Sequence, residues 1–112
     1  MDAEATTEQR QSRRYQVRCP IVFSGDLIDG RGTIEDLSTT GCGVRTGRSI
    51  KGCPYVHLFL YLPDEDLPMK IELAAVRWSK INAFGLEFIR LSQDQQKRLQ
   101  QFLNFLDRRP AH

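Results

Sequence analysis

From residue 17 to residue 90, apolar side chains alternate with polar ones in short runs, and turn residues separate the runs. Val17, Cys19, Ile21 and Phe23 follow this two-residue period in the first run. Such a period is typical of a β-strand that buries one face. About six runs of this kind follow one another without a helical segment between them, and this arrangement predicts a small six-stranded antiparallel β-barrel.

The later runs are bounded by clear breaks. Gly25 and Asp26 predict a turn, and residues 27–37 predict a strand interrupted at Asp29 and Gly30 by a second turn or a bulge. Residues 44–46 predict a short strand. Residues 55–62 read YVHLFLYL and predict a central strand. Its inward side chains are expected to be those of Val56, Leu58, Leu60 and Leu62.

Residues 69–80 and 83–90 predict a long hairpin that turns near Lys80, Ile81 and Asn82. Alternation in the two arms predicts which side chains face inward. These are Ile71, Leu73 and Ala75 in the first arm, and Phe84, Leu86 and Phe88 in the second.

A helical period replaces the strand period after Ser92. Ser92 and Gln95 form the S-x-x-Q version of a capping box, and Asp94 lies where the helix dipole favours negative charge. One helix is therefore predicted at about residues 92–106, packed on the open side of the barrel or against a partner. Core packing is favoured over a dimerisation face for its apolar stripe, which comprises Leu99, Phe102, Leu103 and Leu106.

The 112 residues fit one compact domain, with 40% hydrophobic and 27% charged residues. We expect a flexible N-terminal arm at 1–12, the barrel domain with its helix at 13–107, and a tail at 108–112. No apolar run approaches the roughly 20 residues of a membrane span, and the N-terminus does not resemble a signal peptide. We therefore expect a cytoplasmic protein.

The three cysteines predict neither a disulfide framework nor a metal site. Their number is odd, and no C-x-x-C pair occurs. Cys53 and His57 could share a metal, but no further pair at ligand spacing completes a zinc site. No metal and no cofactor are expected, and at least one or two of the thiols are predicted to be buried and reduced.

The basic residues are distributed unevenly. The net charge of +2 is too small to indicate a nucleic-acid binder, yet twelve of the sixteen basic residues are arginine. Arg10, Arg13, Arg14 and Arg18 fall in residues 9–18, a stretch without an acidic residue. Such a cluster suits bidentate recognition of an anion, although a solvated basic arm would show the same composition.

Two short strings carry most of the functional information. Residues 14–18 form an R-x-x-x-R pair, and residues 36–41 form D-x-S-x-x-G, which begins eighteen residues after Arg18. In this order and at this distance, the strings closely resemble the PilZ domain over roughly residues 13–105. PilZ domains are small bacterial β-barrels of the split-barrel type, and many members bind the second messenger cyclic diguanylate (c-di-GMP). The defining residues are Arg14, Arg18, Asp36, Ser38 and Gly41.

The resemblance implies a role for each of these residues. The guanidinium groups of Arg14 and Arg18 would bind phosphate oxygens or the guanine N7 and O6 atoms, or stack on a base. The carboxylate of Asp36 would accept hydrogen bonds from guanine N1-H and N2-H, while the Ser38 hydroxyl would bridge to base or phosphate. Gly41 would keep the approach of the ligand clear. A second interpretation is that Asp36 and Ser38 merely shape a turn.

Two further side chains are candidates for the same ligand. Trp78 could pack inside the barrel or offer its ring to a purine, as an aromatic residue does in some similar PilZ domains. Arg13 could add a phosphate or base contact, or remain solvated. Residues 85–88, which read GLEF, also resemble a family pattern, but we assign them to core packing.

The resemblance implies a receptor and not an enzyme. The ligand would order the arginine arm, and the ordered arm would relay the signal to a separate effector protein. The alternative is a PilZ-type interaction adaptor with weak or no nucleotide binding. A single-stranded nucleic-acid binder that uses Tyr15, Tyr55, Phe59 and Tyr61 is disfavoured by the low net charge. The sequence leaves homo-oligomerisation and the roles of Arg108 and Arg109 open.

Overall fold

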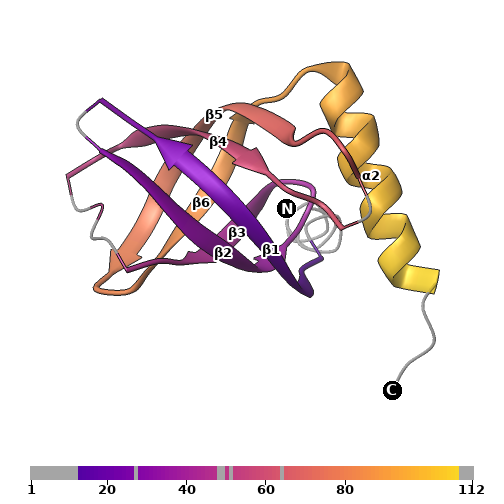
Figure 1. Cartoon of the computed structure of the whole chain (residues 1–112), viewed down its shortest axis with the longest axis horizontal. Coiled ribbons are helices and arrows are strands. Elements are labelled where there is room, and N and C mark those ends of the chain that lie inside the picture. The colour runs from indigo at the N-terminus through magenta and orange to yellow at the C-terminus, as the bar shows by residue number, and fades with distance from the viewer. Residues whose placement is uncertain (1–12, 27, 48–49, 51, 64, 109–112) are drawn as a thin grey trace, which may run out of the picture.

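The computed structural model describes residues 13–26, 28–47, 50, 52–63 and 65–108. The predicted flexible arm at residues 1–12 lies outside the described residues, as do Arg109 and the rest of the tail beyond it. Within the described chain, six strands close into a barrel in the order β1-β2-β3-β6-β5-β4, and every neighbouring pair is antiparallel (Figure 1). The strands and the helix are β1 Tyr15–Ser24, β2 Asp29–Leu37, β3 Gly41–Arg45, β4 Tyr55–Leu60, β5 Met69–Lys80, β6 Ala83–Arg90 and α2 Gln93–Arg108. The predicted antiparallel barrel with one C-terminal helix is confirmed.

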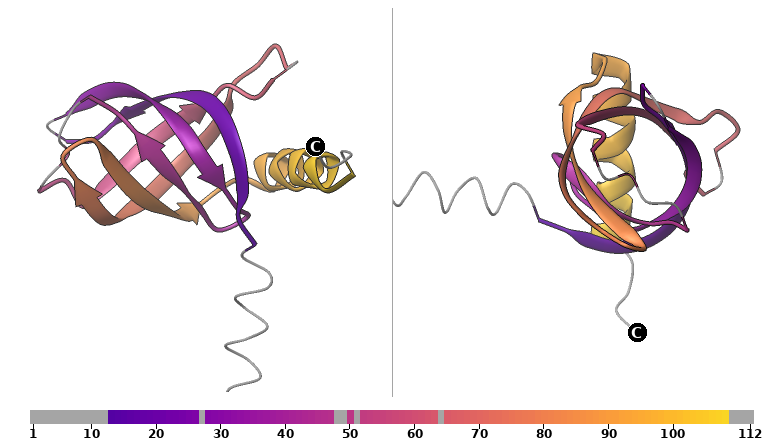
Figure 2. Two further views of the ribbon diagram at one scale, coloured as in Figure 1. Left: turned by 90° about the horizontal axis from the view of Figure 1, so that it is seen from below. Right: turned by 90° about the vertical axis from the view of Figure 1, so that its left-hand side faces the viewer.

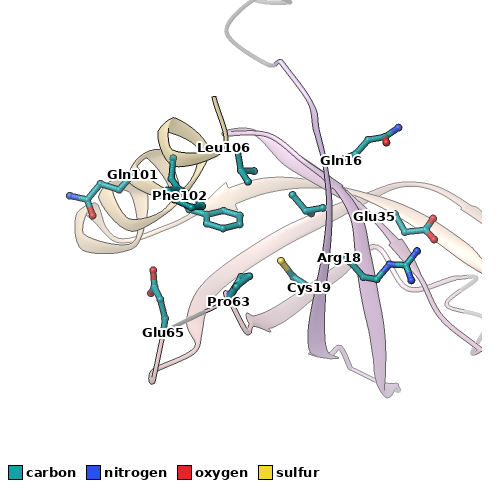
Figure 3. A pocket seen from close by; sticks show the side chains of 11 residues that line it. Gln16, Arg18, Cys19, Glu35, Pro63, Glu65, Gln101, Phe102 and Leu106 are labelled. Atoms are coloured by element: carbon teal, nitrogen blue, oxygen red, sulfur yellow. The ribbon is translucent and has the colours of Figure 1, made fainter. Parts of the chain in front are cut away.

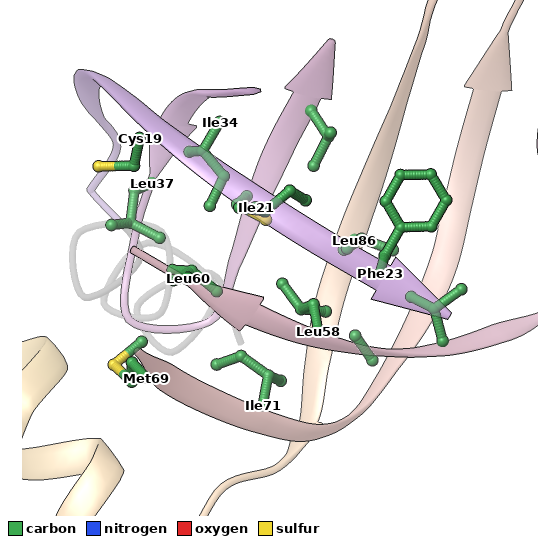
Figure 4. Packing of buried hydrophobic residues seen from close by; sticks show 14 of the residues in the cluster. Cys19, Ile21, Phe23, Ile34, Leu37, Leu58, Leu60, Met69, Ile71 and Leu86 are labelled. Atoms are coloured by element: carbon green, nitrogen blue, oxygen red, sulfur yellow. The ribbon is translucent and has the colours of Figure 1, made fainter. Parts of the chain in front are cut away.

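The alternating side chains fill the barrel as predicted (Figure 4). Cys19, Ile21 and Phe23 of β1 are each 1% exposed, and the four predicted inward residues of the 55–62 segment are all buried. Phe23 meets Phe84 of β6 edge to face, with ring centroids 5.1 Å apart. Full burial of each large apolar side chain contributes about 1.5–3 kcal/mol, so this interior supplies the main stabilisation of the barrel.

The structure departs from simple alternation where one strand carries an extra residue. Between Val56↔Ala74 and Leu58↔Ile71, β5 spans one residue more than β4. The bulge leaves Leu73 half-buried and places Ala74 in the core, so the predicted inward series on β5 is wrong at Leu73. The strand predicted from residue 27 begins instead at Asp29. A turn precedes it, in which the Gly25 amide donates a hydrogen bond to the Ile28 carbonyl at 2.7 Å.

Helix α2 lies across one end of the barrel (Figures 1 and 2). Its first turn is capped by Ser92, whose Oγ accepts a hydrogen bond from the Gln95 amide at 3.2 Å. Leu99 and Leu103 are buried, and Phe102 and Leu106 pack against the same core. The stripe therefore serves core packing, as favoured from the sequence. Among the described residues, no helix is long and apolar enough to cross a membrane.

Candidate ligand-binding site

The two sequence strings meet where β1 begins beside the end of β2. The register places Gln16 opposite Asp36, and Arg14 immediately precedes β1. The Nη1 atom of Arg14 forms an ion pair with Oδ1 of Asp36, and both side chains are partly exposed, at 54% and 37%. One arginine of the first string and the carboxylate of the second therefore lie in direct contact.

This ion pair borders a cavity of about 410 Å³ on the outer surface of the barrel. Its walls come from the segment before β1 and from strands β2, β3, β5 and β6. The cavity brings together Arg14, Asp36 and Trp78, three of the predicted site residues. Its lining comprises Arg14, Asp36, Thr40, Cys42, Gly43, Arg77, Trp78, Gly85, Leu86 and Glu87.

Two glycines form the floor of the cavity. Gly43 of β3 and Gly85 of β6 are cross-strand partners. A Cβ atom at Gly43 would lie 2.5 Å from Oδ2 of Asp36, and one at Gly85 would lie 2.1 Å from Nε1 of Trp78. The missing side chains thus let Asp36 and Trp78 lie against the sheet.

Trp78 lies outside the barrel interior and is 47% exposed. Between Val76↔Leu86 and Trp78↔Gly85, β5 carries one residue more than β6, and this bulge directs the indole over Gly85. Nζ of Lys80 lies 5.5 Å from the Trp78 ring centroid, within the range of a cation–π contact. The indole therefore forms one wall of the cavity and is not part of the core.

The charged groups of the cavity occur as two ion pairs. Arg14 binds Asp36, and Arg77 binds Glu87 on the opposite side. Cys42 also borders the cavity and is a neutral thiol, because burial raises its pKa and Asp36 raises it further, which outweighs the opposing effect of Arg14. Guanidinium forks, carboxylates and an aromatic ring suit a planar, polar anion rather than a nucleophilic reaction. In the described part of the chain, no three His, Cys, Asp or Glu side chains gather as metal ligands.

Ser38 does not reach the cavity. Strand β2 ends at Leu37, and Ser38 lies fully buried in the following turn. Its Oγ accepts hydrogen bonds from the amides of Thr40 and Gly41, each at 3.1 Å. The Ser38 amide donates to the Gly41 carbonyl at 2.9 Å. Ser38 therefore holds the turn that brings Thr40 to the cavity, which matches the second interpretation drawn from the sequence.

Gly41 is enclosed by the barrel and does not border the cavity. A Cβ atom there would lie 2.2 Å from the carbonyl oxygen of Leu86. The glycine thus permits close approach of β3 to β6. The role that the resemblance implies, keeping the approach of the ligand clear, has no counterpart in the lining of the cavity.

Arg18 lies apart from Arg14. Between Gln16 and Cys19, β1 carries one residue more than β2. This bulge interrupts the two-residue alternation of side chains between Arg14 and Arg18. Arg18 lines a different cavity, of about 930 Å³, between β1, the segment after β4 and α2 (Figure 3). There it faces Glu35, whose pKa is lowered by a 2.6 Å hydrogen bond from Arg45 and further by the charge of Arg18.

Arg13 also points away from the site. Its Nη1 atom lies 3.2 Å from Oδ1 of Asp107 on α2, and its guanidinium lies 5.0 Å from the Tyr15 ring centroid. Partial burial and a hydrogen bond to Asp107 raise the pKa of Tyr15. The start of β1 is therefore held to the end of α2 through Arg13 and Tyr15, while Arg14 reaches the cavity.

Gly43, Gly85, Arg77 and Glu87 belong to the site but were not predicted. Core packing, which was expected for the GLEF segment, holds for Leu86 but not for Gly85 or Glu87. Glycine inside a strand was the available signal, because it often marks close approach of another group. The pairing of Gly43 with Gly85 could not be inferred without the register.

Comparison with known proteins identifies one family. The model of the PilZ domain family matches residues 8–105, which is most of the chain. No curated protein sequence matches at a significant level.

Several solved structures share the fold. The PilZ domain of CeSA from a cellulose-synthesizing bacterium superposes with a TM-score of 0.69 at 19% identity, covering 86% of this chain and 99% of that one. The Bacillus subtilis inhibitor of motility, MotI/DgrA, gives a TM-score of 0.69 at 22% identity, covering 90% of this chain and 53% of that one. YcgR from Escherichia coli, in complex with c-di-GMP, gives a TM-score of 0.64 at 15% identity, covering 89% of this chain and 46% of that one. The chain thus spans about half the length of MotI and YcgR, and the similarity concerns the fold.

Proposed function

The chain belongs to the PilZ domain family, and from this premise we propose that it is a receptor for cyclic diguanylate. The family consists of ligand-binding adaptors and not of enzymes. The observation that carries the proposal is the convergence of Arg14, Asp36 and Trp78 on one cavity. The solved structures of YcgR and of PlzA from Borreliella burgdorferi, both complexes with c-di-GMP, share the fold of this chain and support the choice of ligand.

Each cavity residue has a chemical counterpart on the ligand. The Asp36 carboxylate accepts hydrogen bonds from guanine N1-H and N2-H, and Trp78 stacks on the purine. Arg14, released from Asp36, binds a phosphate or the N7 and O6 edge of guanine. Ser38 and Gly41 act indirectly, because they hold the turn that carries Thr40 to the cavity.

Binding exchanges an existing ion pair for contacts with the ligand. An exposed pair such as Arg14–Asp36 contributes about 0–1 kcal/mol, whereas a charge-assisted hydrogen bond to the ligand contributes about 1.5–3 kcal/mol. Immobilising the segment around Arg14 costs about 1–2 kcal/mol for each residue that becomes ordered, so the affinity also depends on the contacts that Asp36 and Trp78 make with the ligand. We propose that Arg13 and Arg18 join the ligand only when this segment rearranges, and that the rearranged surface relays the signal to a separate protein.

One observation favours the adaptor alternative. Arg13 is ion-paired with Asp107, Arg18 lines a different cavity, and Arg14 already neutralises Asp36. A chain that keeps these contacts in the presence of the nucleotide would act as a PilZ-type interaction module with weak or no nucleotide binding.

Calorimetric titration with cyclic diguanylate separates the two functions. We expect saturable binding by the wild type and at least a tenfold loss of affinity, about 1.4 kcal/mol, in Arg14→Ala and in Asp36→Ala. Arg45→Ala is the matched control, because Arg45 is also exposed and ion-paired but does not line the cavity. If the folded wild type does not bind the nucleotide, the receptor function is wrong and the adaptor function remains.

A further inference from the structure

Arg77 and Glu87 line the ligand cavity but have no role in the proposed binding of cyclic diguanylate. The two side chains form an ion pair and are 60% and 45% exposed. Nε of Arg77 donates to Oε1 of Glu87 at 2.5 Å, and Nη2 of the same guanidinium contacts the same oxygen. Among the described residues, Oε2 of Glu87 has no partner. A carboxylate has about four acceptor positions, so Glu87 can still accept hydrogen bonds from a ligand through Oε2.

Asp36 is arranged in the same way in the other ion pair of the cavity. Its Oδ1 atom contacts Arg14, whereas Oδ2 lies over Gly43, 2.5 Å from the place that a Cβ atom would take there. Within the described chain, Oδ2 has no partner either. The cavity therefore contains two carboxylates, and an arginine holds each of them through one oxygen while the other oxygen stays available to the ligand.

The strand register separates the two carboxylates. Asp36 pairs with Gly43, and Gly43 pairs with Gly85, so Asp36 lies two strands from β6 in the row of Gly85. Glu87 lies two residues beyond Gly85 on the same outer face of β6, because Leu86 between them is buried in the core. Two strand spacings of about 4.8 Å and two residues of about 3.4 Å place the Cα atoms of Asp36 and Glu87 roughly 12 Å apart. At this separation the two carboxylates contact different groups of a ligand.

Trp78 connects Glu87 to the base-binding part of the cavity. Nε1 of the indole lies over Gly85, and Glu87 is the next outward side chain along β6. Arg77, which holds Glu87, is the extra residue of the β5 bulge and directly precedes Trp78. A purine that stacks on the indole can therefore present its polar edge to the Glu87 carboxylate.

The charge of Glu87 determines which group of the ligand fits beside it. A carboxylate repels a phosphate, and Arg77 does not offset this repulsion because it is already neutralised by Glu87. The N1-H and N2-H groups of guanine are two donors on one edge, and they suit a group that only accepts hydrogen bonds. Adenine has a donor at N6 but an acceptor at N1 on the same edge, so it would place one acceptor against another. This end of the cavity therefore favours guanine.

We propose that Glu87 is a second specificity-determining residue, and that the cavity recognises both bases of the dinucleotide. Asp36 accepts hydrogen bonds from one guanine, and Glu87 accepts them from the other. This role of Glu87 rests on the proposed function, because it concerns the second base of the same ligand. It implies that a cyclic dinucleotide with a single guanine satisfies only one of the two carboxylates.

Calorimetric titration of the full chain with two cyclic dinucleotides tests this role. The probes are cyclic diguanylate and cyclic GMP-AMP with the same linkages, which has adenine in place of one guanine. We expect the wild type to bind cyclic diguanylate at least tenfold more tightly than cyclic GMP-AMP. Glu87→Gln should reduce this ratio to about threefold or less, because a glutamine amide has both donors and an acceptor and suits adenine as well as guanine. Glu35→Gln is the matched control and should keep the wild-type ratio, since Glu35 is 44% exposed and ion-paired with Arg45 but does not line the cavity.

Two results would overturn the role of Glu87 and leave the receptor function in place. They are equal affinity of the wild type for the two dinucleotides, and a ratio in Glu87→Gln that equals the wild-type ratio. The ratio compares two affinities of one variant, so a partial loss of folded protein would not change it. Absence of cyclic diguanylate binding by the folded wild type would overturn the receptor function itself, and the role of Glu87 with it.

Discussion

At the scale of single residues, the site depends on two glycines whose missing side chains leave space for its functional groups. Asp36 and Trp78 can lie against the barrel because Gly43 and Gly85 leave room for them. Both glycines lie inside strands, where glycine weakens the sheet relative to other residues. The two glycines leave space for the side chains that would contact the ligand, and this space is a physical reason for glycine at these strand positions.

Replacing Gly85 with alanine should displace the indole of Trp78, because the new Cβ would lie 2.1 Å from Nε1. We expect altered tryptophan emission and at least a several-fold loss of affinity for cyclic diguanylate, with the barrel still folded. Gly47→Ala serves as the control, since a Cβ at Gly47 would meet nothing within 4 Å. Unchanged emission and affinity in Gly85→Ala would show that the position of the indole does not matter.

The cysteines should differ sharply in reactivity. Cys19 and Cys42 are each 1% exposed, whereas Cys53 is half-buried near the surface. Burial raises the pKa of both buried thiols above the ordinary 9.0, so they stay protonated and unreactive as pH rises from about 7 to about 9. We expect a disulfide reagent to label one thiol in the native chain and three after unfolding. Rapid labelling of two or three native thiols would contradict the burial.

The same raised pKa values affect stability at alkaline pH. The thiols of Cys19 and Cys42 ionise at a lower pH in the unfolded chain than in the folded one. The contribution of these protonated thiols to the free energy of unfolding is therefore complete below about pH 9. It is lost as the pH rises further.

At the scale of elements, the bulges decide which predicted side chains meet. The two-residue period located the strands and most of the inward residues. It could not locate the extra residue in β1 between Gln16 and Cys19 or the one in β5 before Trp78. The first bulge separates Arg18 from Arg14, and the second turns Trp78 over Gly85. Bulges depend on pairing with another strand, so the sequence of one strand alone does not reveal them.

Helix α2 is fastened to the barrel by Arg98. Its guanidinium donates to Oε1 of Glu65, to the Leu67 carbonyl at 2.6 Å and to the Pro68 carbonyl at 3.2 Å. Arg98→Ala should lower the free energy of unfolding by about 1–2 kcal/mol, because two carbonyls and a partly buried carboxylate lose their donor. Arg98→Lys should recover only part of this, since one ammonium cannot span the three acceptors.

Denaturant unfolding measures the effect of these substitutions. Lys97→Ala, at the exposed neighbouring position, should stay within about 0.5 kcal/mol of the wild type. If Arg98→Ala proves as stable as Lys97→Ala, the helix is held by its apolar stripe alone.

At the scale of the whole molecule, the sequence predicted the architecture better than the detail of the site. The barrel, the terminal helix and its apolar stripe followed from periodicity and capping. The family resemblance implied that Arg14 and Asp36 bind one ligand, and in the structure the two side chains form an ion pair. The cavity itself could not be predicted, because its floor and walls come from four strands whose register only the closed barrel defines.

The distribution of charge over the molecule predicts a moderate salt dependence of ligand affinity. The net charge is only +2, so attraction of the anion comes from the arginines beside the cavity and not from the chain as a whole. Raising the salt from about 0.1 M to about 1 M shortens the Debye length from about 10 Å to about 3 Å. Titrations at the two concentrations should show a several-fold weakening, and an affinity independent of salt would contradict the role of the arginines.

The position of Trp78 gives the most direct test of the central claim, that cyclic diguanylate occupies the cavity bounded by Arg14 and Asp36. Trp78 is the single tryptophan of the chain and lines this cavity. Its emission, excited outside the guanine absorption band, should change saturably as the nucleotide is added to the wild type. The same change should require at least tenfold more nucleotide in Asp36→Ala. Binding detected by calorimetry with no change in Trp78 emission would place the ligand elsewhere and contradict the account.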